Sequence, residues 1–121
     1  MWIFCKHGFF SAVKDRDHAG NLLVRARFPG DLQRLIDSYL DPDMAESMKK
    51  EIRETPTADY AFRLSMSQQV FAAMVASIAS DIDYDNFKDS VHGERIRDGA
   101  YIQCWFALRN AQEKLANPEQ V

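Results

Sequence analysis

The stretch from residue 58 to residue 89 constrains the fold most, because a strand pattern passes into a helix pattern with no break between them. Its first part alternates apolar residues with others, as a strand with one buried face does: Tyr60, Phe62, Leu64 and Met66. Ser67 then predicts a helix N-cap, and an apolar stripe follows at helical spacing: Phe71, Met74, Val75, Ile78 and Ile82. We therefore predict a strand followed directly by an amphipathic helix that folds back over it.

The N-terminal third of the chain indicates three further strands. Two short apolar runs, residues 2–5 and residues 9–13, are separated by a plausible turn and predict a hairpin. A third strand is predicted for residues 21–28, where apolar residues alternate with others that include Arg25 and Arg27. Because successive side chains point to opposite faces of a sheet, these two arginines must share one face.

Helical patterns follow the third strand and close the chain. A first helix is predicted over residues 31–40 with Asp31 as its N-cap, and an acidic capping box predicts a short second helix over residues 43–50. Residues 51–55 precede a proline and predict a short edge strand with one apolar side chain inward. The longest helical pattern covers residues 94–116.

This order of elements predicts an α+β fold. We expect a two-layer, ferredoxin-like antiparallel sheet of four or five strands, with helices packed on one face and a long C-terminal helix. A chain of 121 residues has the length of one ordinary domain, so a single domain over residues 1–121 is predicted.

Composition narrows the class of protein. Hydrophobic residues make up 46% of the chain and charged residues 27%, which is typical of a globular protein and excludes a disordered chain. The formal net charge of −3 gives no overall attraction to nucleic acid or to an anionic membrane. The N-terminus has no signal-peptide pattern, and Cys5 and Cys104 fit no secreted disulfide framework, so we expect free thiols and a cytoplasmic protein.

The first candidate site is a set of three arginines. If Tyr60, Phe62 and Leu64 face the helices, Arg63 shares the opposite sheet face with Arg25 and Arg27. Guanidinium groups on one face can grip phosphate or carboxylate, and stacking surfaces would be added by Trp2 and Phe4, or alternatively by Phe10. The competing interpretation is that the three arginines pair with acidic neighbours and only solubilise the sheet.

A polar cluster forms the second candidate, around the block Asp81 to Asp89. Counting from Asp81, a calcium loop would need glycine at its sixth position and glutamate at its twelfth, but the sequence has Asn86 and His92 there. The motif therefore fails. The polar residues that could still gather in a cleft are Asp59, Asp83, Asn86 and Lys88.

No metal or catalytic pattern is found. Cys5 and His7 occupy same-face positions, but zinc needs four ligands and the spare histidines, His18 and His92, lie in loops. No serine stands in a nucleophile elbow, and no glycine-rich phosphate loop occurs. We expect no metal, no cofactor and no catalytic residue.

The predicted helix after Ser67 has an outward face without charge: Ala72, Ala73, Ala76, Ser77 and Ser80. Such a face is poorly suited to water, so we expect it to be covered, by the last helix or by a second copy in a homodimer. Trp105 lies in the middle of the apolar arc of the last helix and is expected in the core.

Several blocks together carry a family resemblance: Met1-Trp2-Ile3-Phe4, Gly8-Phe9-Phe10-Ser11, Val24-Arg25-Ala26-Arg27, Asp59-Tyr60 with Phe62-Arg63, Asp83-Tyr84-Asp85-Asn86-Phe87-Lys88, and Tyr101 with Trp105. In this order they resemble a family of small uncharacterised bacterial proteins. The resemblance spans almost the whole chain and departs from the family mainly at residues 41–54, which are longer and more charged here. It implies no activity.

We therefore expect a small, non-enzymatic binding or interaction protein of the cytoplasm, such as an accessory or phage-type inhibitor that docks on a protein partner. A possible homodimer and no membrane association belong to the same expectation. One alternative is a nucleic-acid or nucleotide binder that uses Arg25, Arg27 and Arg63. The other is a small enzyme with a polar cleft formed by Asp59, Arg63, Asp83 and Lys88.

Overall fold

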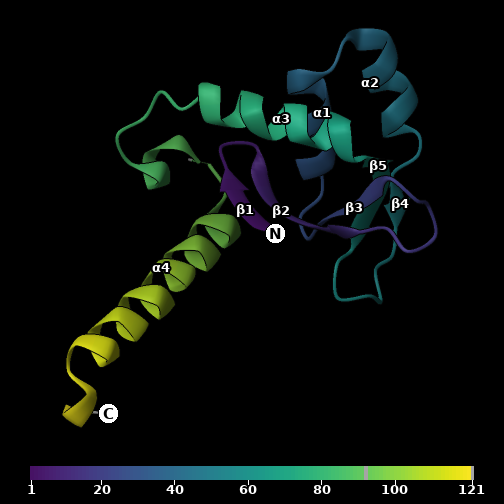
Figure 1. The fold of residues 1–121 in the computed structure, drawn as a ribbon. Helices are drawn as coiled ribbons and strands as arrows, with labels where there is room; N and C mark the ends of the chain where they lie inside the picture. Colours follow the sequence, from purple (N-terminus) through teal and green to yellow (C-terminus); the bar gives the residue numbers. More distant parts are fainter. Residues whose placement is uncertain (92, 121) are drawn as a thin grey trace. The chain divides into compact units, whose positions relative to one another are not determined.

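The chain forms two compact units, Met1–Asp83 and Tyr84–Val121, in a computed structural model that describes residues 1–91 and 93–120 (Figure 1). The expectation of a single domain stays a prediction beside this division. The first unit contains these elements: β1 (Trp2–Cys5), β2 (Gly8–Lys14), β3 (Asn21–Ala26), α1 (Asp31–Tyr39), α2 (Pro42–Lys49), β4 (Arg53–Glu54), β5 (Phe62–Ser67) and α3 (Gln68–Ser80). The second contains the 3₁₀ turn η1 (Phe87–Ser90), α4 (Arg95–Ala116) and the short turn η2 (Pro118–Gln120).

The sheet of the first unit has five strands in the order β1-β2-β3-β5-β4, and every neighbouring pair is antiparallel. The predicted hairpin, third strand and edge strand are all confirmed. Together with the helices and the long α4, the sheet confirms the α+β class and the ferredoxin-like description.

One face of this sheet carries the hydrophobic core. The buried strand residues alternate along β2, β3 and β5 and meet the apolar stripes of α1 and α3: Phe10, Ala12, Val24, Ala26, Leu64, Met66, Leu32, Leu35, Ile36, Phe71 and Met74. Ile52, before β4, also packs against this cluster. The helices therefore cover one face, as the two-residue alternation predicted.

The start of α1 differs from the prediction. Gly30, at φ 85°, is the N-cap, and Asp31 is the first helical residue. The Asp31 carboxylate is buried, accepts a hydrogen bond from the Phe9 amide at 3.3 Å and pairs with Arg34. The prediction of Asp31 as N-cap is wrong because Gly30 occupies that position and the Asp31 carboxylate accepts the Phe9 amide of the β1–β2 hairpin.

Close packing at this point requires a glycine. Gly8, at the start of β2, has φ 146°, and a Cβ added there would collide with the carboxyl group of Asp31. Glycine adopts this conformation without the steric cost that other residues meet. The turn of the first hairpin and the first turn of α1 are thus joined through Gly8 and Asp31.

The helices α2 and α3 both start at a residue whose side chain caps the helix. Asp41 caps α2, accepting hydrogen bonds from the amides of Asp43 and Met44 at 3.1 Å. The predicted start at residue 43 is wrong because Pro42, whose fixed φ suits the first helical position, begins the helix earlier. Ser67 caps α3 as predicted, accepting from the Val70 amide at 3.1 Å.

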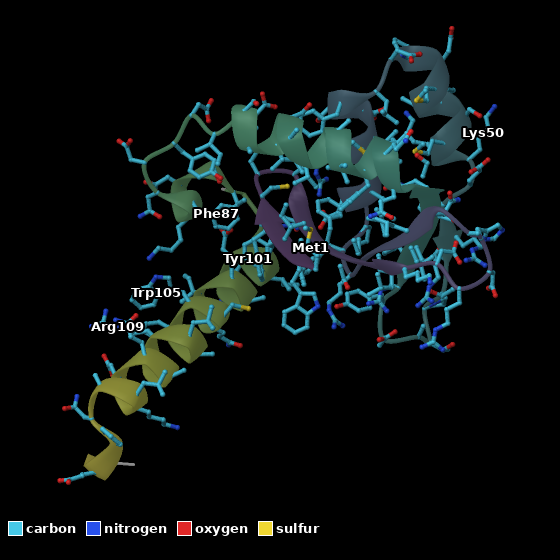
Figure 2. The ribbon with its side chains drawn as sticks, in the orientation of Figure 1. Met1, Lys50, Phe87, Tyr101, Trp105 and Arg109 are labelled. Atoms are coloured by element: carbon cyan, nitrogen blue, oxygen red, sulfur yellow. The ribbon has the colours of Figure 1, made fainter. Side chains whose placement is uncertain are left out.

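In the second unit, η1 packs on the first half of α4. The Phe87 ring stacks on Tyr101 with centroids 6.0 Å apart, and the Lys88 ammonium lies 5.1 Å from the centroid of Trp105. Figure 2 shows Tyr101, Trp105 and Arg109 at successive turns of this helix.

The prediction of Trp105 as a core residue is wrong, because 45% of its side chain is exposed. Its indole ring lies against Lys88, Arg109 and Phe106. Other apolar residues of α4 are also exposed: Ile96, Ile102, Phe106, Leu108 and Leu115. Coverage of the uncharged α3 face by this helix stays a prediction.

Within the described ranges, none of the helices combines the length and the apolar character that crossing a bilayer requires.

Candidate functional site

Three arginines stand side by side on neighbouring strands. The register pairs Arg25 of β3 with Arg63 of β5, and Arg63 with Arg53 of β4. The same row continues through Ser11 of β2 to Trp2 of β1. Directly opposed residues of antiparallel strands share a face, and this one lies opposite the core. We call it the arginine face and define it by these residues: Trp2, Phe4, Phe9, Ser11, Arg25, Arg53 and Arg63.

Arg25 occupies the middle of this row. Its Nη2 donates a hydrogen bond to the Ser11 hydroxyl at 2.8 Å, and its guanidinium lies 4.4 Å from the centroid of the Tyr60 ring. Its Nε is buried and has no hydrogen-bond partner among the described residues. A buried donor without an acceptor costs about 1–3 kcal/mol, so a stable fold alone gives little reason for an arginine at this position.

Tyr60 contributes to this site, and its predicted place facing the helices is wrong. It lies in the bend before β5, is 4% exposed, and has the guanidinium groups of Arg25 and Arg27 at 4.4 and 4.1 Å from its centroid. Strand alternation does not reach back to residue 60 because β5 begins at Phe62. Attraction between the cations and the aromatic face holds the ring instead.

Arg27 and Arg63 hold the loop that carries Tyr60. Arg27 Nη1 donates to the Asp59 carbonyl at 2.6 Å. Arg63 Nε donates to the Thr55 hydroxyl at 3.2 Å, and Arg63 Nη2 lies 3.7 Å from the Asp59 carboxylate. The competing interpretation, that the predicted arginines serve the scaffold, thus applies in part to these two.

Arg53 is the arginine that the sequence reasoning missed. It is exposed, stands opposite Arg63, and forms no hydrogen bond or ion pair within the described part of the chain. The signal was present, because an edge strand with Ile52 inward places residue 53 on the opposite face. Its guanidinium remains available to a ligand.

Acidic neighbours do not neutralise this row. Within the described chain, Arg25, Arg53 and Arg63 form a single ion pair with a carboxylate. It joins Arg63 to Asp59, whose side chain is 69% exposed. Like charges directly opposite one another on a sheet destabilise it. Positive charge is therefore concentrated locally in a protein whose net charge is −3.

An aromatic cluster occupies the other end of the same face. Phe4 stacks on Phe9 with ring centroids 4.5 Å apart, and Trp2 meets Phe9 edge-on at 6.2 Å. Trp2 is 73% exposed and Phe4 38% exposed. Of the two alternatives weighed from the sequence, Trp2 and Phe4 join the arginine face, whereas Phe10 is buried in the core.

The polar residues expected to share a cleft have separate contacts. Asp59 pairs with Arg63, and Asn86 caps η1 by accepting a hydrogen bond from the Lys88 amide at 3.0 Å. In the described residues, no hydrogen bond or ion pair joins Asp83 to Asp59 or to Arg63. These contacts organise a loop and a helical turn.

A further titratable cluster lies at one end of the sheet. The Asp15 carboxylate accepts hydrogen bonds from the Ser65 hydroxyl at 2.5 Å and from the Asp17 amide at 3.0 Å, with His18 Nδ1 also at 3.0 Å. The Ser65 hydroxyl lowers the pKa of Asp15 most, followed by the Asp17 amide. A carboxylate with a lowered pKa is a poor general base, so this cluster fixes the β2–β3 loop and does not activate Ser65.

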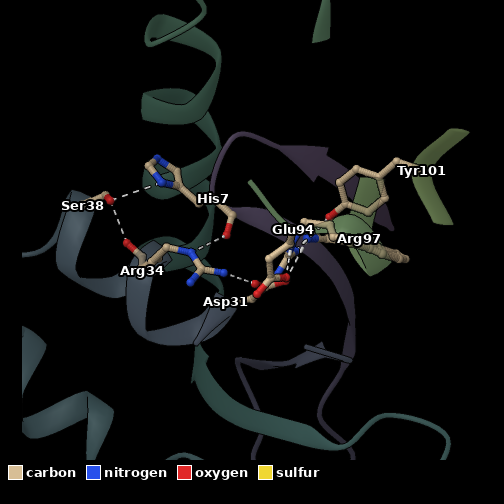
Figure 3. A network of polar contacts seen from close by, with 8 residues as sticks. His7, Asp31, Arg34, Ser38, Glu94, Arg97 and Tyr101 are labelled. Carbon is tan, nitrogen blue, oxygen red and sulfur yellow. Dashed lines mark hydrogen bonds and ion pairs between the residues drawn. The ribbon is translucent and has the colours of Figure 1, made fainter. Parts of the chain in front are cut away.

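His7 belongs to a structural network that Figure 3 shows beside α1. Its Nε2 lies 2.9 Å from the Tyr39 hydroxyl, and Arg34 donates to its carbonyl at 3.2 Å. Burial, followed by the charge of Lys6, lowers the pKa of His7. Cys5 is buried in the core, where burial raises the pKa of its thiol.

Among the described residues, no three His, Cys, Asp or Glu side chains come together as a metal site would require. His92, one of the spare histidines, lies outside the described residues.

The chain was compared with protein-family models, with curated proteins and with solved structures. None of them matches it.

Proposed function

We propose that this protein is a non-enzymatic binding protein whose ligand contacts the arginine face. The observation that carries the proposal is the register of Arg25, Arg63 and Arg53 on adjacent strands with a single carboxylate partner among the described residues. Guanidinium groups favour ligands that present phosphate or carboxylate oxygens, because their planar forks match these groups. A cytoplasmic site of action and membership of the family that the sequence resembles belong to the same proposal.

A binding role is favoured over catalysis because the polar side chains outside this face serve the scaffold. Asp31 and Asp15 accept backbone amides, and Asn86 caps a turn. Arg53, in contrast, has no partner in the described chain, and the buried Nε of Arg25 is unpaired. The Arg53 guanidinium is therefore not used by a hydrogen bond or ion pair of the described chain and can serve a ligand.

The test uses the intact protein as bait in a host extract, beside a variant that carries Arg25→Met and Arg53→Met. Methionine preserves most of the side-chain bulk and removes the charge. Lys50→Gln is the matched control, since Lys50 is an exposed cation at the C-terminal end of α2 and lies outside the arginine face (Figure 2). We expect the wild type and the control to retain the same bound component and the double variant to lose it while still folded. Equal retention by all three proteins contradicts the proposal.

A second candidate function is self-association through α4. Its support is the set of exposed apolar side chains on this helix, which includes Phe106, Leu108 and Leu115 at 54%, 74% and 84% exposure. Sedimentation equilibrium measures it directly. A dimer that Leu108→Glu converts to a monomer supports this function, and a wild-type monomer at high concentration excludes it.

A further inference from the structure

The arginine face combines two kinds of chemistry that one ligand class requires together. Its cationic part is the row of Arg25, Arg63 and Arg53, and its aromatic part is formed by Trp2, with Phe4 and Phe9 stacked beside it. A ligand with phosphate alone would use the arginines and leave a large apolar surface in water. A purely apolar ligand would leave the Arg53 guanidinium without a partner in the described chain.

The two parts lie on one line across the strands. Trp2 pairs with Ser11, Ser11 with Arg25, Arg25 with Arg63 and Arg63 with Arg53. Adjacent strands are about 4.8 Å apart, so the row from Trp2 to Arg53 extends over roughly 19 Å. This length suits a short polymer segment that carries planar rings and negative groups along its backbone.

The exposed aromatic rings are not needed by the core. Phe10 and Ala12, on the other face of β2, already fill the space beneath the helices, whereas Trp2 keeps 73% of its surface in water. An exposed indole at the end of a cationic row can take a stacked base, because every base has a π-face.

We infer that the arginine face binds single-stranded nucleic acid, with a base stacked on Trp2 and phosphates held by Arg25, Arg53 and Arg63. This inference rests on the proposed function and names its ligand class. A duplex is disfavoured because its bases are already stacked and paired, so they cannot reach the aromatic rings. Specificity for a particular sequence is not required, since stacking and charge are both tolerant of base identity.

The experiment measures binding of fluorescent mixed-sequence single strands, both RNA and DNA, by anisotropy at several salt concentrations. Three phosphate contacts predict that log K falls with log salt at a slope of about −2. Arg53→Gln, which removes no contact within the described chain, should reduce the size of this slope by about 0.7. Lys50→Gln should change neither the affinity nor the slope.

Stacking is tested separately. Trp2→Ala should weaken single-strand binding by roughly 5- to 150-fold, the usual range for one stacked base, and Trp2→Phe should restore much of it. A duplex of the same sequence should bind at least about tenfold more weakly than the single strand. Inorganic polyphosphate should compete, with an affinity that Trp2→Ala leaves unchanged.

Equal affinity for duplex and single strand, or a single-strand affinity insensitive to Trp2→Ala, overturns the inference. If no oligonucleotide binds but the component captured from extract still depends on Arg25 and Arg53, the inference fails and the proposed function stands. If neither binding depends on these arginines, both fail. Circular dichroism of each variant distinguishes lost binding from lost fold.

Discussion

The two faces of the same sheet differ in what determines their residues. On the core face, alternating positions of β2, β3 and β5 are apolar and fully buried, and the helices α1 and α3 complete their packing. On the arginine face, the intervening positions carry cations, a buried hydroxyl and exposed aromatic rings. Because the strands are shared, backbone geometry cannot explain the difference. Burial explains the first face, and we infer that a ligand explains the second.

The largest expected effect is a difference in stability loss between a core-face substitution and an arginine-face substitution in the strand pair β1–β2. Phe10→Ala removes a fully buried ring from the core and should lower the free energy of unfolding by about 3–5 kcal/mol. Trp2→Ala removes an even larger side chain from the arginine face, yet the change should stay below about 1 kcal/mol. Urea unfolding of both variants measures this. Similar losses in the free energy of unfolding for the two variants would show that both faces stabilise the fold to the same extent.

A second prediction concerns the turn that joins the sheet to α1. Gly8→Ala introduces a Cβ that collides with the Asp31 carboxyl group and forces an unfavourable φ, which costs about 1–3 kcal/mol for the conformation alone. Gly99→Ala is the matched control, because a Cβ in that helical position meets open space and should stabilise α4 by about 0.5–1 kcal/mol. Thermal unfolding should show opposite shifts in Tm. A neutral Gly8→Ala would mean that the hairpin and α1 are less closely packed than described.

The next prediction is that the free energy of unfolding depends on pH through His7, in the β1–β2 turn. The pKa of His7 is lowered mainly by burial, so the folded protein binds a proton there less readily than the unfolded chain. The stabilising contribution is therefore complete above the unfolded value of about 6.5 and is lost as the pH falls toward the folded pKa. Denaturant titrations between pH 7.5 and pH 5 should show a loss of stability that is smaller in His7→Gln. An identical pH profile for the variant would exclude His7 as its source.

Much of the fold was predictable because burial imposes a regular period. The strands, the helix after Ser67 and the sharing of one face by Arg25 and Arg63 all follow from alternation or helical spacing. Errors arose where a single side chain made a nonlocal contact. Asp31 binds the Phe9 amide instead of capping its helix, and Tyr60 leaves the strand pattern because its ring lies against the guanidinium groups of Arg25 and Arg27.

The candidate site was predictable in part for the same reason. Alternation along the strands placed Arg25 and Arg63 on one face. Arg53 joins them through the pairing of β4 with β5, and no local pattern fixes the register of this two-residue strand. The exposure of Trp105 was missed because an apolar stripe shows that a surface must be covered without showing what covers it.

The central claim is that Arg25 and Arg53 serve binding and add little to the stability of the fold. The free energy of unfolding of the Arg25→Met, Arg53→Met variant tests it most directly. Arg53 has no hydrogen bond or ion pair to lose in the described chain. The loss of the Arg25 hydrogen bond to Ser11 and of its contact with the Tyr60 ring is offset by removal of a buried unpaired donor and of like-charge repulsion. We predict that the free energy of unfolding in urea changes by less than about 1 kcal/mol. A loss of more than about 3 kcal/mol would contradict it and would make these arginines part of the scaffold.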